Sequence, residues 1–588
     1  MNRKCWKLLL LSFLMALTLA GCKEKLGDEE AQKQFDEFIQ NDFVDTMETD
    51  YLTMHIYLEH PEDYGVDPAN VNVQIAEKFD ETQFEESRND LEALKDEFDV
   101  FDRDQLTGEQ QATYDCYHFM LELALKACDE KFDYMGSNFN TMTGDHTQIP
   151  TLFADMVLRS EQDVKDLITL VNDVKPYMES DLEYTKKQAE NGTLVIGIDE
   201  VKERCQEIVD AGMEGSTLSS MKAHIDELNI DNGAKKTYKK QLEEAYRTSF
   251  LPAYENVIAT LSELDESKNH HTGLANMDNG KEYYELLFKE ATGTDTSIEE
   301  VKKQLEEAGE DALLRAQMIY LKNSKAYDAF LEDSVRTSYT DYASMLVDLE
   351  KAIADDFPTV SKLEYQIEPL PADLATGGIA AYFNIPAIDG TTKKQIRVNT
   401  TSKEDTDTID TFTTVAHEGI PGHMYQIAYA YENITSPWRL TCTNFSGYTE
   451  GYATYMELYA LHYLDVDEDV KDLFEAMTIY EHSLIALVDI GIHYEGWDLK
   501  QLQAFFEEYG LDKNAATEIY DQILYNPSAF LSYYVGYQEI ISMKEEAQEA
   551  LGGQYSDLGF HTALLKSGQA PFAVVKQNID AYVETAKK

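Results

Sequence analysis

The sequence has few residues that would divide the chain or cross-link it. It contains 13 prolines and six cysteines among 588 residues, and it has no Gly/Ser-rich linker, low-complexity tract or internal repeat. This argues against a string of small domains on linkers, and the lack of a CxxC pair excludes a structural zinc ribbon. A chain of this length needs no disulfide to support its core, so we expect buried thiols or at most one bridge at Cys116, Cys128, Cys205 and Cys442.

Basic residues are also scarce. There are 49 Lys and Arg against 110 Asp and Glu, a formal net charge of −61. Such a surface repels phosphate groups, which excludes nucleic acid and anionic lipid headgroups as partners. High charge can accompany disorder, but 43% of the residues are hydrophobic and 11% are aromatic, which is enough to build a core. We therefore place the acidic excess on a solvated exterior.

Long hydrophobic runs are missing except near the N-terminus. The run LLLLSFLMALTL, residues 8–19, follows three basic residues and is short for a membrane span, which is typical of a signal peptide. It ends in LAGC, residues 19–22, which resembles the lipobox of bacterial lipoproteins. We predict a signal peptide at 1–21, lipidation of Cys22 and a polar tether over 22–30. An ordinary secretory signal and an uncleaved anchor are the alternatives.

Most of the remaining chain has the pattern of amphipathic helices. Apolar residues recur at intervals of three and four along residues 108–127, 160–191 and 297–323. Because no linker interrupts the pattern, we predict one large, mostly helical domain over residues 31–588, with lobes around a cleft.

One stretch departs from the helical pattern. GGIAAYFNIPAI, residues 377–388, and TTKKQIRVNT, residues 391–400, flank the turn dipeptide Asp389-Gly390. This pattern predicts a β-hairpin. An exposed edge strand would bind an extended peptide through main-chain hydrogen bonds. The alternative is a structural hairpin with both edges covered.

The segment HEGIPGH, residues 417–423, places two histidines six apart with a glutamate beside the first. The zinc-protease signature HExxH has them four apart on one helix face. On an uninterrupted helix, His417 and His423 would differ in direction by about 120°. Pro421 and its glycine neighbours disfavour such a helix, so we predict a break or bulge after Glu418 that returns His423 towards His417. Two histidines and a carboxylate suit hydrolytic zinc, with a second carboxylate as the base.

A second motif lies downstream at a suitable distance. YTEGYATYMELYALHYL, residues 448–464, has a helical pattern that places Glu450 and Glu457 on one face. TEGYA is similar to the NEGFA-like segment of aminopeptidases, whose glutamate is the third zinc ligand. This favours Glu450 as the ligand, with Glu457 either orienting a ligand or standing as a solvated helix acid.

Four motifs in order carry a family resemblance. HEGIPGHMYQ, EGYATYME, DIGIH (489–493) and YNPSAFLSYYVG (525–536) together resemble the bacterial family called domain of unknown function 885, which is similar to the zincin metallopeptidases. The resemblance implies a large helical zincin-like fold with a small hairpin or sheet beside the zinc helix, and a zinc-site part at about 375–540. Where many relatives carry arginine ahead of DxGxH, this chain has His482 and Ile485. That departure puts an inherited preference for a substrate carboxylate in doubt.

The resemblance also implies roles for individual residues. His417, His423 and Glu450 would hold one Zn²⁺ per chain, and Glu418 would be the general base.

The resemblance implies further roles at the substrate carbonyl oxygen, which becomes an oxyanion during hydrolysis. Tyr533, which matches the tyrosine of the family, and His493 would stabilise it, with Asp489 supporting His493. Tyr534 is the fallback for the tyrosine, and a satisfied core histidine is the alternative for His493.

We therefore predict an extracytoplasmic zinc metallopeptidase, attached to the bacterial cell membrane through its N-terminal lipid alone. It would hydrolyse peptide bonds, chiefly of short peptides. Two other functions are open: a zinc amidase acting on a non-standard amide such as a cell-wall cross-link, and a non-catalytic lipoprotein that binds peptides. The sequence leaves open whether cleavage is terminal or internal, and it leaves the oligomeric state open.

Overall fold

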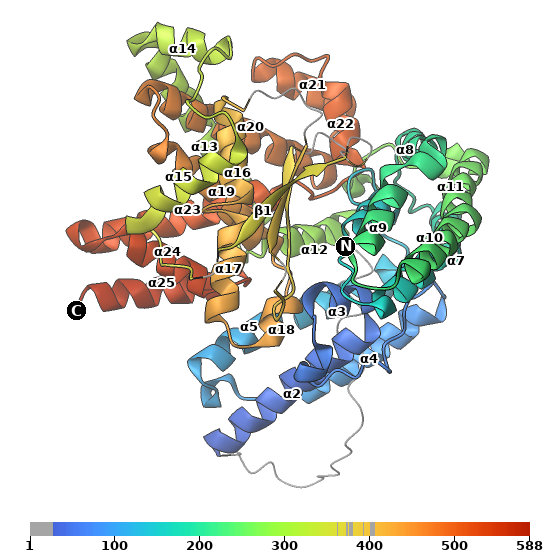
Figure 1. Cartoon of the computed structure of the whole chain (residues 1–588). Helices are drawn as coiled ribbons and strands as arrows, with labels where there is room; N and C mark the ends of the chain where they lie inside the picture. The colour runs from blue at the N-terminus through green and yellow to red at the C-terminus, as the bar shows by residue number, and fades with distance from the viewer. Residues whose placement is uncertain (1–26, 362, 372–373, 375–379, 392, 400–405) are drawn as a thin grey trace. The chain divides into compact units, whose positions relative to one another are not determined.

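The structure is a computed structural model, and it is mostly helical with one small sheet (Figure 1). It describes residues 27–588 except 362, 372–373, 375–379, 392 and 400–405. The predicted signal peptide and Cys22 lie outside the described residues. Helix α2 begins at Asp28, so the last residues of the predicted tether are helical.

The chain divides into two compact units, and the prediction of one domain over 31–588 stays a prediction. Unit 1 comprises Met1–His271 and Ala387–Thr391, and unit 2 comprises Thr272–Pro386 and Thr392–Lys588. The α-helices described in unit 1 are α2 (Asp28–Thr49), α3 (Tyr51–Tyr57), α4 (Thr82–Phe98), α5 (Gly108–Ala127), α6 (Asp145–Asp155), α7 (Glu161–Asn191), α8 (Ile198–Ala211), α9 (Ser216–Glu227), α10 (Asn232–Ala245) and α11 (Leu251–Glu263).

Unit 2 holds the sheet and every motif singled out between residues 417 and 536. Its elements are α12 (Gly280–Thr292), α13 (Ile298–Lys322), α14 (Ser324–Leu331), α15 (Tyr342–Ala352), β1 (Tyr365–Leu370), β2 (Ala381–Asn384), β3 (Lys394–Asn399), α16 (Ile409–Glu418), α17 (His423–Asn433), α18 (Pro437–Thr441), α19 (Ser446–Tyr459), α20 (Glu468–His493), α21 (Leu499–Glu508), α22 (Ala516–Leu524), α23 (Leu531–Leu551), α24 (Asp557–Lys566) and α25 (Phe572–Ala586).

The helices predicted from periodicity are confirmed as α5, α7 and α13. Local caps explain why their starts were predictable: Thr107 accepts a hydrogen bond from the backbone N–H of Gln110, and the Gln110 side chain accepts one in return from the Thr107 N–H. Ser160 caps α7 in the same way, and Ser297 caps α13. Each cap satisfies backbone N–H groups that a helix end leaves without a partner.

The predicted hairpin is confirmed in its pairing and differs in its connection. β2 pairs antiparallel with β3, and β1 pairs parallel with β3, giving the order β1-β3-β2. Residues 385–393 join the two hairpin strands, so Asp389-Gly390 is not a two-residue turn. The Asp389 carboxylate instead accepts hydrogen bonds from the backbone N–H groups of Glu59 and His60, at 2.7 and 2.8 Å within unit 1.

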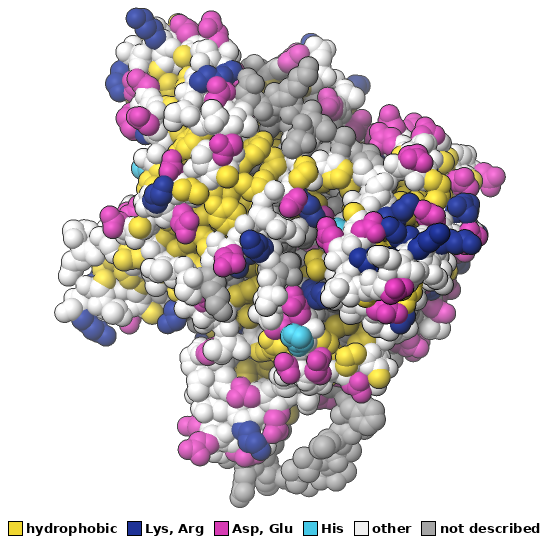
Figure 2. Space-filling view, in the orientation of Figure 1, with side chains coloured by type: hydrophobic (Ala, Val, Ile, Leu, Met, Phe, Trp, Pro, Cys, Tyr) yellow, Lys and Arg dark blue, Asp and Glu magenta, His cyan; other side chains and the backbone are white. Residues whose placement is uncertain are grey.

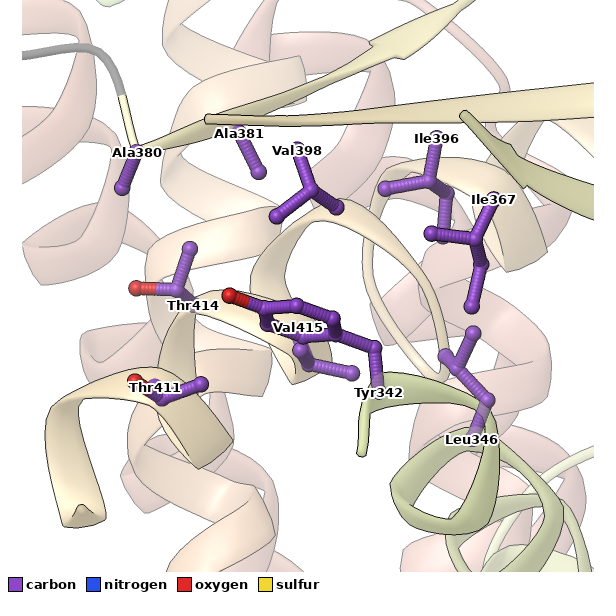
Figure 3. Close-up of a pocket in the computed structure, with 10 residues that line it drawn as sticks. All are labelled: Tyr342, Leu346, Ile367, Ala380, Ala381, Ile396, Val398, Thr411, Thr414 and Val415. Carbon is purple, nitrogen blue, oxygen red and sulfur yellow. The ribbon is translucent and has the colours of Figure 1, made fainter. Parts of the chain in front are cut away.

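One face of the sheet packs on α15 and α16. The pairings place Ile367, Ile396, Val398 and Ala381 on the same face, because side chains on paired strands alternate together. Figure 3 shows this apolar layer above Leu346 of α15 and residues of α16, including Val415. A cavity of about 10 Å³ remains there, lined by Tyr342, Leu346, Ile367, Ala380, Ala381, Ile396, Val398, Thr411, Thr414 and Val415.

The four cysteines of the described chain are free thiols, and all but Cys128 are buried. Acidic side chains are scattered over the face drawn in Figure 2, with fewer Lys and Arg between them. Within residues 27–588, as far as these are described, no helix combines the length and the apolar character needed to cross a membrane.

Candidate metal centre

The helix that carries His417 ends where the sequence predicted. α16 stops at Glu418, and α17 begins at His423. A Cβ at Gly422 would lie 1.8 Å from the carbonyl oxygen of His417, so only glycine allows the chain to fold back this closely. Tyr452 of α19 donates a hydrogen bond to the Pro421 carbonyl at 2.8 Å and holds the bend. The two histidines therefore stand on separate helices that converge.

The helix that carries Glu450 packs against α23 through glycines. A Cβ on Gly451 would lie 2.4 Å from the carbonyl carbon of Gly536, and a Cβ on Gly536 would lie 1.9 Å from the carbonyl oxygen of Gly447. These backbones can approach only because none of the three residues has a side chain. The close packing brings Glu450, beside Gly451, and Tyr533, one turn before Gly536, to the same place.

His417, His423 and Glu450 form a group with the spacing of metal ligands. The three ligand atoms lie within 4.8 Å of one another. Glu450 Oε2 is 3.3 Å from His423 Nε2 and 3.7 Å from His417 Nε2. Ligands at zinc distances on a tetrahedron stand about 3.4 Å apart, so the two distances from Glu450 suit a zinc site with three protein ligands.

Glu457 contacts the opposite nitrogen of His417. Its Oε2 lies 3.2 Å from His417 Nδ1, so the carboxylate accepts the Nδ1 proton and Nε2 is directed towards Glu450. Carboxylates commonly hold metal-binding histidines in this way. Of the two roles considered for Glu457, the structure supports the orienting one.

Glu418 lies beside the ligand group and is held by the sheet. Its Oε1 is 3.9 Å from His417 Nε2, and its Oε2 accepts a 2.9 Å hydrogen bond from the backbone N–H of Phe383 in β2. Burial raises the pKa of Glu418, and the positive charges of His423 and His417 oppose this increase. The contact with Phe383 could not be read from the sequence, although the predicted hairpin next to HEGIPGH indicated where to look.

The charges of the group favour a cation between its members. Burial alone would lower the pKa of His417, but hydrogen bonds with Glu450 and Glu457 outweigh burial and raise that pKa well above its usual value. Burial alone would raise the pKa of Glu450, but the charges of the two histidines hold it well below its usual value. A divalent cation would displace the extra proton of His417 and balance the negative charge of Glu450.

Of the two neighbouring tyrosines, only Tyr533 faces the ligand group. Its ring lies 6.3 Å from that of His417, with 23° between the planes. The negative charge of Glu450, followed by burial, raises the pKa of Tyr533, so its hydroxyl keeps its proton. Tyr534 is buried elsewhere: its ring lies 5.5 Å from that of His482, and its hydroxyl accepts a hydrogen bond from Gln538.

His493 and Asp489 are not among the residues brought together here. His493 is fully buried, its Nδ1 accepts from the Leu274 N–H at 3.3 Å, and its Nε2 is 3.0 Å from the Ile523 carbonyl oxygen. Asp489 accepts hydrogen bonds from the Tyr284 hydroxyl and the Ser528 N–H, and neither of these bonds involves His493. The arrangement matches the core-histidine alternative, so we assign His493 no role at the metal centre.

Residues 64–579 match the family model described as a bacterial protein of unknown function, DUF885. The chain belongs to this family. No curated protein matches the sequence.

Two solved structures show the same fold as this DUF885 protein. A candidate lipoprotein of Colwellia psychrerythraea is 16% identical and has a TM-score of 0.81, with 94% of this chain and 99% of that chain covered. A candidate lipoprotein of unknown function from Shewanella oneidensis is 14% identical and has a TM-score of 0.65, with 93% and 98% covered. At these identities the likeness extends to the fold alone.

The four motifs of the DUF885 resemblance fall into two groups in space. HEGIPGH, the EGYA segment and Tyr533 lie at the candidate metal centre, whereas DIGIH lies in the core with its polar atoms bound to other parts of unit 2. The sequence alone does not tell the motifs at the candidate metal centre from the motif in the core, because all four are short and lie on helices or at their ends.

Proposed function

We propose that this protein is a zinc-dependent peptidase, attached to the outer face of the cell membrane through a lipid on Cys22. One observation carries the proposal: His417, His423 and Glu450 converge at the spacing of zinc ligands, while Glu418 is held beside them by a strand. The names of both similar structures as candidate lipoproteins support the anchor.

Each residue of the group has a distinct task in this mechanism. His417, His423 and Glu450 would hold the zinc, which when bound supplies a positive charge that polarises the scissile carbonyl and acidifies a water. Glu418 takes a proton from the attacking water and gives it to the leaving amine, and its raised pKa suits both transfers. Tyr533 donates its hydroxyl proton in a hydrogen bond to the carbonyl oxygen as negative charge develops there.

The edge of β2 supports a peptide as the substrate. The Phe383 N–H points away from β3 and reaches Glu418. The side of β2 that has no partner strand among the described residues therefore faces the proposed base. Backbone groups alternate along a strand, so Ala381 directs its N–H and C=O to the same side. An extended peptide that pairs with this edge would lie across the metal centre with a peptide bond beside Glu418.

Metal analysis and peptide cleavage test the proposal together. Three proteins lacking residues 1–22 are compared: wild type, Glu418→Gln and His423→Ala. We expect about one zinc per chain in wild type and in Glu418→Gln, none in His423→Ala, and cleavage of a peptide library by wild type alone. A wild type that binds no metal tightly would sink the proposal and favour the peptide-binding lipoprotein.

Methylating the backbone nitrogens of a cleaved peptide tests whether the preferred substrate is an ordinary peptide or another kind of amide. If the substrate pairs with β2, N-methylation at alternate residues removes hydrogen bonds and lowers kcat/KM by about 10-fold, while methylation at the residues between has little effect. Cell-wall cross-linked peptides serve as the comparison. A much higher kcat/KM on those, with no alternation in the methylated series, would support the amidase instead.

The anchor is tested on the full chain. Radiolabelled palmitate should enter the wild type and not Cys22→Ser, and the variant should leave the membrane fraction. Equal labelling of the two proteins would contradict lipidation at Cys22.

A further inference from the structure

The DIGIH motif holds two buried ionisable side chains that the proposed mechanism does not use. Asp489 and His493 are one turn apart on α20, and both are 0% exposed. Burial of two such groups is unfavourable unless their polar atoms are hydrogen-bonded. Here each of the four polar atoms has a partner within unit 2.

Two of these four bonds hold the connection between α22 and α23. The Leu274 N–H donates to Nδ1 of His493, so Nε2 carries the proton and donates to the Ile523 carbonyl at 3.0 Å. Asp489 Oδ2 accepts from the Ser528 N–H at 2.9 Å. Ser528 has a φ of +65°, which is unfavourable for a residue with a side chain, and this hydrogen bond stabilises it. The connection is thus held at the end of α22 and again at Ser528.

The other contacts brace the same two side chains. The Tyr284 hydroxyl donates to Asp489 Oδ1, and the Tyr284 ring stacks on His493 with the centroids 5.6 Å apart. Tyr284 lies in α12, so a second helix supports the α20 pair.

The connection held in this way leads directly to Tyr533. α23 begins at Leu531, and Tyr533 is its third residue. Each residue turns a helix by about 100°, so a shift of one residue in the connection would turn Tyr533 away from His417. The close contacts of Gly536 with α19 hold the turn that follows Tyr533, and the connection holds the start of α23 that precedes it, so Tyr533 lies between two supports.

We propose that Asp489 and His493 are positioning residues that hold Tyr533 at the metal centre through residues 523–528. This inference rests on the proposed function, in which the Tyr533 hydroxyl contacts the substrate. DIGIH then serves catalysis by positioning Tyr533, and it does not contact the substrate.

Steady-state kinetics test the proposal with Asp489→Asn and Tyr284→Phe. We expect each variant to lower kcat by about 10- to 100-fold, because small misplacements of a catalytic group cost rate, while KM and zinc content stay unchanged. Tyr117→Phe is the matched control, because Tyr117 in unit 1 makes a similar buried hydrogen bond to Asp42, at 3.0 Å. It should keep the kcat of the wild type.

A double-variant cycle shows whether the effect passes through the tyrosine. If Asp489 acts through Tyr533, Asp489→Asn/Tyr533→Phe should be no slower than Tyr533→Phe alone. If the double variant instead lowers kcat by the product of the two single effects, the proposal is overturned, because Asp489 then acts by another route.

A spectroscopic measurement tests the positioning without any substrate. With 3-fluorotyrosine introduced only at position 533, we expect one sharp ¹⁹F line in the wild type that moves when zinc is added. Tyr284→Phe should broaden or displace the line although the zinc content is unchanged, and Tyr117→Phe should not.

The outcomes separate this inference from the proposed function. The same line and the same zinc response in Asp489→Asn, Tyr284→Phe and wild type would overturn the positioning role. A wild-type line that ignores zinc but changes in Tyr284→Phe would support the positioning role and contradict the metal centre.

Discussion

Unit 2 contains two clusters of acidic and histidine side chains, and their environments differ. In the candidate metal centre, the side chains of His417, His423 and Glu450 are 13%, 16% and 25% exposed, and they contact one another. On α20, Asp489 and His493 are 0% exposed and contact the backbone or a tyrosine instead. The comparison teaches that the partners of an acid and a histidine, more than their identity, decide whether they are available to a ligand.

The pKa values differ in the same sense. In the metal centre, the pKa of His417 is raised and that of Glu450 is lowered, so the charged forms are favoured. On α20, burial raises the pKa of Asp489 to about 7 and lowers that of His493 to about 4, so the neutral forms are favoured. The first cluster suits a cation, and the second suits a hydrogen-bonded core.

The largest expected effect comes from deleting one carboxylate in each cluster. Glu450→Ala should lose zinc and activity, because a ligand is missing. Asp489→Ala should retain zinc but lose about 2–6 kcal/mol of stability, because it leaves the Tyr284 hydroxyl and the Ser528 N–H buried without a partner. Zinc analysis and urea unfolding measure the two effects. Loss of zinc from both variants would break the comparison.

Opposite pH slopes of stability are the next largest effect, measured on zinc-free protein. Native Asp489 keeps its proton up to about pH 7, whereas the unfolded chain releases it near 3.8, so this contribution falls as pH rises through that window. Native His493 stays neutral down to about pH 4, whereas the unfolded chain is protonated below 6.5, so its contribution rises with pH. The two slopes, about 1.4 kcal/mol per pH unit each, cancel between about pH 4 and 6.5.

Single variants should reveal these slopes. Relative to wild type, the stability of Asp489→Asn should rise more steeply with pH between 4.5 and 6.5, and that of His493→Gln should fall. Urea unfolding across this range gives the free energies. Parallel curves for all three proteins would mean that the α20 pair does not titrate as its burial requires.

A smaller effect concerns the carboxylate behind His417. Glu457→Gln should weaken zinc binding by about 10- to 100-fold without abolishing it, because the amide holds Nδ1 less strongly. Competition with a fluorescent chelator measures the affinity. Glu418→Gln is the control and should bind zinc as tightly as wild type, since Glu418 lies outside the ligand group. An unchanged zinc affinity in Glu457→Gln would show that Glu457 does not orient His417 and is a solvated helix acid.

The smallest effect is expected at the cavity under the sheet. Thr414 is one turn before Glu418 on α16 and lines the cavity beneath Ala381 of β2 (Figure 3). Thr414→Leu adds more volume than this space of about 10 Å³ holds, so we expect it to cost about 1 kcal/mol of stability in urea unfolding while kcat/KM for peptides stays unchanged. A stability equal to that of the wild type would show that the sheet and α16 move apart to hold the larger side chain.

Several features of the molecule were predictable from local sequence. The amphipathic helices and the α16 break after Glu418 follow from periodicity and from Pro421 with its glycine neighbours, and the structure has them. The pairing of β2 with β3 was predictable from composition, but the length of its connection was not. The ligand types at 417, 423 and 450 were equally evident, because residue chemistry is a local property.

By itself, the sequence determined which segments are helical, where α16 stops and which side chains are able to hold a metal. The tertiary structure alone decided that Tyr533 and not Tyr534 faces His417, that Glu457 contacts His417 Nδ1, and that His493 is bound to the backbone. The physical reason is that neighbouring helix residues point about 100° apart, so function depends on which face another helix covers. That choice is made by contacts such as Gly536 on Gly451, between residues distant in the chain.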